Sequence, residues 1–154
     1  MMTKNQALSL IPQWSEAAKP LRIVLIVQLL WAVGAIMWNV VGVQRIEQNL
    51  QPLGPTASLT AAIALGVFAL LLALGLRFSA VLYALLSLIG VPAAGVAIFG
   101  AFTHDVSMWP SEVWRYTGVA LNSIGVLSSI VAVAGSVAFL LRRHSAKKAA
   151  YSAN

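Results

Sequence analysis

The sequence predicts an all-α integral membrane protein, an antiparallel bundle of four transmembrane helices with both termini in the cytoplasm. Three observations predict it. Hydrophobic residues make up 60% of the 154 residues and charged residues only 9%, whereas a soluble domain carries about 25% charged residues. The mean hydropathy is +0.86. The apolar residues gather in four blocks without Asp, Glu, Lys, Arg or His, and the basic residues lie between these blocks.

This composition excludes three classes of protein: a soluble enzyme, a disordered chain and a nucleic-acid-binding domain. The net charge of +6 does not indicate a nucleic-acid partner, because the basic residues flank apolar blocks and form no basic face. The chain has no cysteine, which excludes disulfides, thiolate metal sites and S-palmitoylation.

Residues 1–22 form the predicted cytoplasmic N-terminal segment. It is either unordered or a short amphipathic helix on the inner leaflet that Pro20 closes. The first span covers residues 23–43, and about 20 apolar residues suffice to cross a bilayer. Its apolar core is longer than the roughly 7–15 residues of a signal peptide, so the segment is retained. Its small and polar residues share one face that favours left-handed helix packing: Gln28, Ala32, Ala35, Asn39 and Gly42.

The second and third spans form a predicted hairpin. The second covers residues 56–76, with a start at Thr56 or Thr60, and Arg77-Phe78-Ser79 makes a tight turn. The third covers residues 80–102. Pro92 in its middle removes one backbone hydrogen bond and predicts a kink. A static bend supported by neighbouring helices is the expected role of this kink, and a functional hinge is the alternative.

The fourth span covers residues 116–141, and a basic cytoplasmic tail follows at 142–154. Trp109 and Trp114 lie where this span would meet the outer interface, as in an aromatic belt. The basic residues of the tail are expected to contact anionic headgroups, at about 1 kcal/mol each, or a cytoplasmic partner. They are Arg142, Arg143, Lys147 and Lys148.

The distribution of Lys and Arg predicts the orientation. Of the ten, only Arg45 and Arg115 fall on one side of the four spans, and the other side is therefore predicted to be cytoplasmic. Short loops and the lack of sorting signals favour a bacterial inner membrane. The eight residues of the predicted cytoplasmic side are Lys4, Lys19, Arg22, Arg77, Arg142, Arg143, Lys147 and Lys148.

Three amide side chains, Gln28, Asn39 and Asn122, are the large polar groups within the predicted spans. Such groups join helices by hydrogen bonds more often than they bind a transported substrate. Asn39 and Asn122 lie at similar depths below the outer interface. We therefore expect the first and fourth spans to pack together and these two amides to bond, directly or through one water.

One ionisable cluster, His104, Asp105 and Glu112, falls in the second outer loop. It could bind a divalent metal or respond to pH. Two or three ligands on a flexible loop do not make a metal site, so a solvated loop is the expected role. The sequence predicts no metal and no cofactor.

These observations predict a non-enzymatic accessory, assembly or immunity-type partner of a larger membrane system. The alternative is a small oligomeric transporter or channel whose path is lined by Gln28, Asn39 and Asn122. A membrane enzyme that uses His104, Asp105 and Glu112 is the least favoured, because its groups lie outside the spans. The expected partners are the lipid bilayer and a membrane protein or a second copy, and no nucleic acid.

Overall fold

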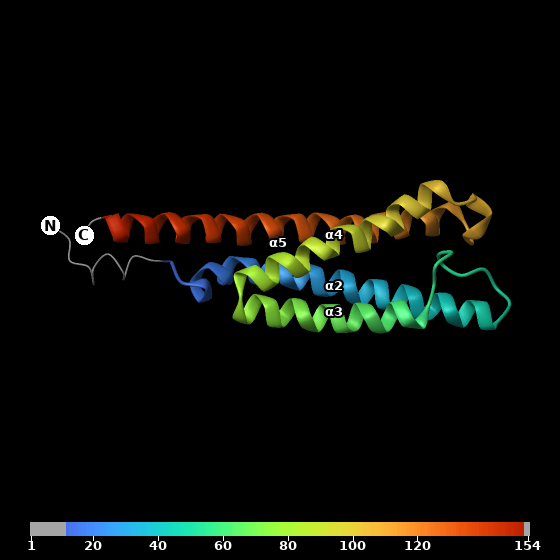
Figure 1. The fold of residues 1–154 in the computed structure, drawn as a ribbon. Coiled ribbons are helices and arrows are strands. Elements are labelled where there is room, and N and C mark those ends of the chain that lie inside the picture. The colour runs from blue at the N-terminus through green and yellow to red at the C-terminus, as the bar shows by residue number, and fades with distance from the viewer. Residues whose placement is uncertain (1–11, 153–154) are drawn as a thin grey trace.

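A computed structural model describes residues 12–152 and shows four long helices joined by short connections (Figure 1). The helices are α2 (Trp14–Glu47), α3 (Leu59–Phe78), α4 (Ala80–Thr103) and α5 (Glu112–Ser152), with a short 3-10 helix, η1 (Val106–Met108), between α4 and α5. Within residues 12–152 there is no strand. All four helices are long and apolar enough to span a membrane, as predicted.

The bundle has two distinct ends. The start of α2, the turn between α3 and α4, and the end of α5 lie together at the terminal end. Residues 48–58 and residues 104–111 form the two connections of the opposite end, called the loop end here (Figure 1). The helices pack as a ring in which α2 contacts α3 and α5, and α4 contacts α3 and α5.

Helix α2 is one continuous helix of 34 residues, and Pro20 lies inside it. The prediction that Pro20 closes a separate helix is therefore wrong. Pro20 removes only the bond to the carbonyl of Glu16, an exposed residue of the first turn. The indole N–H of Trp14 meanwhile donates to the Leu76 carbonyl at 2.9 Å and attaches the first turn to α3. Residues 1–11 of the predicted N-terminal segment lie outside the described residues.

The end of α2 is set by Asn49. This residue has φ of 58°, a left-handed conformation that asparagine tolerates better than most residues. The N–H groups of Asn49 and Leu50 then donate to the carbonyls of Ile46 and Arg45, which completes a Schellman cap.

Serine caps define the hairpin of α3 and α4. The hydroxyl of Ser58 accepts a hydrogen bond from the Ala61 N–H, so α3 begins at Leu59, and Pro55 stays in the loop. Ser79 ends α3 and caps α4 through the Leu82 N–H, which confirms the predicted tight turn. Pro92 lies inside α4, which continues through it from Ala80 to Thr103.

Helix α5 is longer than the predicted fourth span. It is one helix of 41 residues, about 60 Å long at 1.5 Å per residue. Residues 142–152 of the predicted tail are therefore a helical extension of the span, and residues 153–154 lie outside the described part. The side chains of Arg142, Arg143, Lys147 and Lys148 are exposed along this extension.

The core combines alanines with large apolar side chains. Ala32, Ala94 and Ala132 are fully buried on three different helices and allow close approach of their backbones. Near the terminal end, Leu72 and Tyr83 fill the space between the helices. The predicted seam of α2 is confirmed, because Gln28, Ala32, Ala35 and Gly42 are buried and Asn39 is half-buried.

Candidate functional site

The centre of the bundle holds a buried polar cluster around Gln28. The Gln28 amide nitrogen donates to Ser87 Oγ at 3.2 Å and to Ser129 Oγ at 3.4 Å. Its amide oxygen accepts from the Tyr83 hydroxyl at 2.8 Å. Gln28, Tyr83, Ser87 and Ser129 all have no exposed surface. The side chain of Gln28 therefore links α2 to α4 and α5.

Asn39 and Asn122 do not form the predicted direct bond with each other. The Asn39 amide nitrogen donates to the Ala35 carbonyl, and its oxygen accepts from the Ser58 N–H at 3.0 Å. The Asn122 nitrogen donates to the Gly118 carbonyl, and its oxygen accepts from the Trp31 indole at 3.4 Å. The prediction that the helices pack together is confirmed, because α2 contacts α5.

A cavity of about 540 Å³ opens in the loop-end half of the bundle, and all four helices contribute to its wall. Asn39 and Asn122 lie in this wall, whereas Gln28 does not. Aromatic side chains make up much of the lining: Trp31, Trp38, Phe68 and Trp109. The wall is thus largely apolar, with a few polar groups, as in most sites for small molecules.

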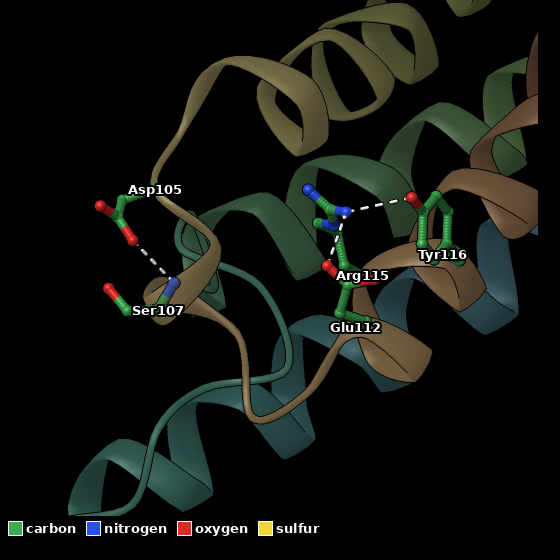
Figure 2. A network of polar contacts seen from close by, with 5 residues as sticks. All are labelled: Asp105, Ser107, Glu112, Arg115 and Tyr116. Carbon is green, nitrogen blue, oxygen red and sulfur yellow. Dashed lines mark hydrogen bonds and ion pairs between the residues drawn. The ribbon is translucent and has the colours of Figure 1, made fainter.

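Arg115 is the one arginine in this wall, and its side chain is only 12% exposed. Its Nη2 donates to Glu112 Oε1 and to the Tyr116 hydroxyl, both at 3.1 Å (Figure 2). The guanidinium also lies 4.8 Å from the centre of the Tyr116 ring. The Nε of Arg115 is buried and has no hydrogen-bond partner among residues 12–152. One donor of this charged group is thus unused, although it is enclosed by protein and not exposed to the cavity.

The predicted cluster of His104, Asp105 and Glu112 does not converge on a common point. His104 Nδ1 pairs with the Gly100 carbonyl at 2.8 Å, and Glu112 is bound to Arg115. Asp105 accepts from the Ser107 N–H at 2.8 Å and caps η1 (Figure 2). Hydrogen bonds from the side chain and the backbone of Ser107 lower the pKa of Asp105. Within the described part of the chain, no three His, Asp or Glu side chains could hold a metal ion.

Sequence reasoning identified Gln28 but missed Tyr83 and Arg115. Ser87 and Ser129 stand in rows of small residues at helical spacing, with Gly90 in α4 and with Gly125 in α5. Such rows are typical of helix contacts, so the sequence held a signal for two partners of Gln28. Tyr83 had no comparable signal, since a tyrosine near a helix start is typical of an interface. Arg115 was counted as a loop charge, and only the folded chain brings it into the wall.

Comparison with known proteins found no similarity to interpret: no family model, no curated protein and no solved structure matches the chain.

Proposed function

We propose that the chain is a small non-enzymatic membrane protein that serves as an accessory, assembly or immunity-type partner of a larger membrane system. One observation carries this proposal. The polar groups at the centre of the bundle bind one another through Gln28, so they stabilise the helix packing. The ionisable side chains of the loop end likewise bind neighbouring residues. The polar side chains inside the bundle thus act mainly in packing.

The proposed orientation places the terminal end of the bundle in the cytoplasm, in a bacterial inner membrane. Among the described residues, this end carries the basic residues Lys19, Arg22 and Arg77 and the four of the α5 extension, 142–148. Arg143 and Lys147 are four residues apart on this helix and therefore share a face. We propose that this face contacts anionic headgroups or an acidic surface of the partner.

The partner is tested by gentle extraction of the tagged full chain and affinity capture from its native membrane. We expect a larger membrane protein to be recovered in stoichiometric amount. Replacing Arg142, Arg143, Lys147 and Lys148 by Gln should lower its recovery several-fold. The matched control replaces Lys19 and Arg22, which lie at the same end on α2, and should leave recovery unchanged. Recovery of the chain alone, or only of further copies of itself, would overturn the proposal.

A small transporter or channel is the second candidate, because Asn39 and Asn122 both line the loop-end cavity. Gln28 lies outside that wall, so a path across the membrane would require the helices to separate at the position of Gln28. Flux of ions and small polar solutes through vesicles that contain the purified chain distinguishes the two candidates. The accessory protein gives no flux. A flux that Asn122→Leu reduces and Gln28→Ala increases would favour the transporter.

A further inference from the structure

The loop-end cavity combines an apolar interior with unused hydrogen-bond donors at its mouth. We propose that it binds a single-chain amphiphile with a carboxylate head, whose head meets Arg115 and whose tail lies between α3 and α4. This inference is independent of the proposed function, since it concerns the cavity and requires no protein partner.

The part of the cavity wall formed by Gly54, Trp109 and Arg115 is called the mouth here. Three hydrogen-bond donors without an acceptor lie at this mouth. The first is Nη1 of Arg115, which donates to no residue in 12–152 and which, unlike Nε, is not enclosed by protein. The indole N–H groups of Trp38 and Trp109 are the other two, and neither donates to a residue in 12–152, whereas those of Trp14 and Trp31 do. The indoles of Trp38 and Trp109 meet at Gly54, where a Cβ atom would lie 3.1 Å and 3.9 Å from their Nε1 atoms. Arginine and tryptophan cannot accept hydrogen bonds, so this mouth suits an oxygen-rich head.

The charge at the mouth fits a head with one negative charge. Arg115 contributes one positive charge, and Glu112 is 62% exposed, so water screens much of its effect. Arg115 therefore keeps much of its positive charge at the cavity wall. A carboxylate balances this single charge and can accept from two or three donors at once. A phosphate dianion would carry a second charge, and among residues 12–152 the wall holds no second arginine or lysine to balance it.

The interior fits an aliphatic tail. Leu65, Phe68 and Leu121 line the cavity below the mouth, and Phe68 lies nine residues into α3, about 14 Å below its first residue. The volume of about 540 Å³ falls within the roughly 300–1,000 Å³ of small-molecule sites.

The wall between α3 and α4 offers an entrance from the membrane. Ala64 of α3 and Ala93 and Ala97 of α4 line the cavity and are also exposed. Figure 1 shows that α4 leaves α3 after their turn and crosses toward α5, so the two helices diverge toward the loop end. An amphiphile could therefore enter sideways with its head at the interface and its tail at hydrocarbon depth.

The test uses the full chain in nanodiscs of neutral phosphatidylcholine, with tryptophan fluorescence as the readout. The probe is a long-chain fatty acid brominated in mid-chain, and the comparisons are an alcohol and an alkyl phosphate with the same brominated chain. Bromine quenches nearby indoles, and three of the five tryptophans, Trp31, Trp38 and Trp109, line the cavity. Partition of any probe into the lipid should cause quenching that rises linearly with probe concentration. We expect the fatty acid to cause additional quenching that saturates at one molecule per chain.

Two variants and two matched controls locate the site. Arg115→Gln should weaken the saturable binding about tenfold or more, because it removes a charge-assisted hydrogen bond. Ala97→Phe should abolish it by filling the cavity, and it keeps every polar group of the mouth. Arg45→Gln changes the other loop-end arginine, which is not in the wall, and Ala120→Phe changes an exposed alanine of α5. Both controls should leave the binding unchanged.

Four outcomes would overturn the proposal. Equal saturable binding of the alcohol would show that the head is not recognised by charge. Tighter binding of the alkyl phosphate would assign the mouth to a phosphate head. Quenching that is linear in the wild type, or saturable quenching that Ala97→Phe leaves unchanged while the protein keeps its helical circular dichroism, would show that the cavity holds no amphiphile.

Discussion

Gln28 lies where α2, α4 and α5 meet, and its amide makes all three of its described hydrogen bonds across helix boundaries. Inside a membrane such bonds are individually modest, about 0.6 kcal/mol on average and up to about 1.7. A buried group that loses its partner costs more than the bond itself, about 1–3 kcal/mol. The effect of removing Gln28 therefore depends on what its neighbours lose.

Gln28→Leu should lower the free energy of unfolding by about 1–3 kcal/mol, because the Tyr83 hydroxyl loses its acceptor. Tyr83→Phe should cost less, because only the Gln28 amide oxygen loses its partner, whereas Gln28→Leu removes the partner of Tyr83 and of both serines. In the double variant the two losses should sum to more than the measured loss. Unfolding by denaturing detergent, followed by circular dichroism, measures all three. Gln44→Leu, at an exposed position of the same helix, is the control. If the two losses of unfolding free energy add exactly in the double variant, Gln28 and Tyr83 do not interact, and the proposed cluster is wrong.

At the scale of the elements, particular glycines allow neighbouring helices to approach each other closely. Gly125 of α5 faces the Trp31 indole, and a Cβ there would lie only 2.6 Å from Trp31 Nε1. Trp31 is 2% exposed and is held by Asn122 and by an edge contact with Phe68. By contrast, a Cβ at Gly66 would meet nothing within 4 Å.

Gly125→Ala should destabilise the bundle by about 1–3 kcal/mol, because the rigid indole cannot yield without disturbing its neighbours. Gly66→Ala should be neutral or should stabilise α3 by up to about 1 kcal/mol, because alanine is the better helix former. The same unfolding assay measures both variants. An equal effect of the two substitutions would show that α2 and α5 are not packed through Trp31.

The first turn of α2 makes one hydrogen bond to α3, in addition to the apolar packing of Ala18 and Leu21 against Leu72 and Leu76. Trp14→Phe removes the hydrogen bond to the Leu76 carbonyl, worth about 1 kcal/mol. Amide hydrogens near residues 17–21 should then exchange roughly fivefold faster, since opening of this segment becomes easier. Trp114→Phe, at the loop end, should leave this exchange unchanged. Unaltered protection in Trp14→Phe would mean that the segment is held by other contacts.

At the scale of the whole molecule, the asymmetry of charge predicts one orientation. Among the described basic residues, seven lie at the terminal end, and only Arg45 and Arg115 lie at the loop end. The positive-inside rule then favours a cytoplasmic terminal end.

Single cysteines test this orientation, and the absence of native cysteine makes the background clean. Gln48→Cys and Ser111→Cys at the loop end should react with an impermeant maleimide added to intact cells. Ser145→Cys on the α5 extension should react only after permeabilisation. The reverse pattern would invert the orientation, and labelling of all three from outside would contradict four spans.

The all-helical class, the four apolar helices and the tight turn at residues 77–79 could be predicted from the sequence alone. These features depend on local quantities: the length of an apolar run, the lack of charge within it, and a short polar residue between two runs. The extent of the helices was less predictable, because packing and caps decide where a helix ends. Thus α2 runs through Pro20, and α5 continues through the basic tail.

Which polar groups meet could not be predicted from the sequence, because it depends on the packing of the whole bundle. Gln28 and Ser87 are 59 residues apart, and their bond depends on how each helix is rotated and tilted. The same geometry gives Asn39 and Asn122 separate partners, so the direct form of the bond that their similar depth predicted is not made. It also places Arg115, which the sequence predicts to lie in an outer loop, in the wall of a cavity. Depth along a helix follows from residue number, but rotation about its axis and divergence from a neighbour depend on the contacts of the whole bundle.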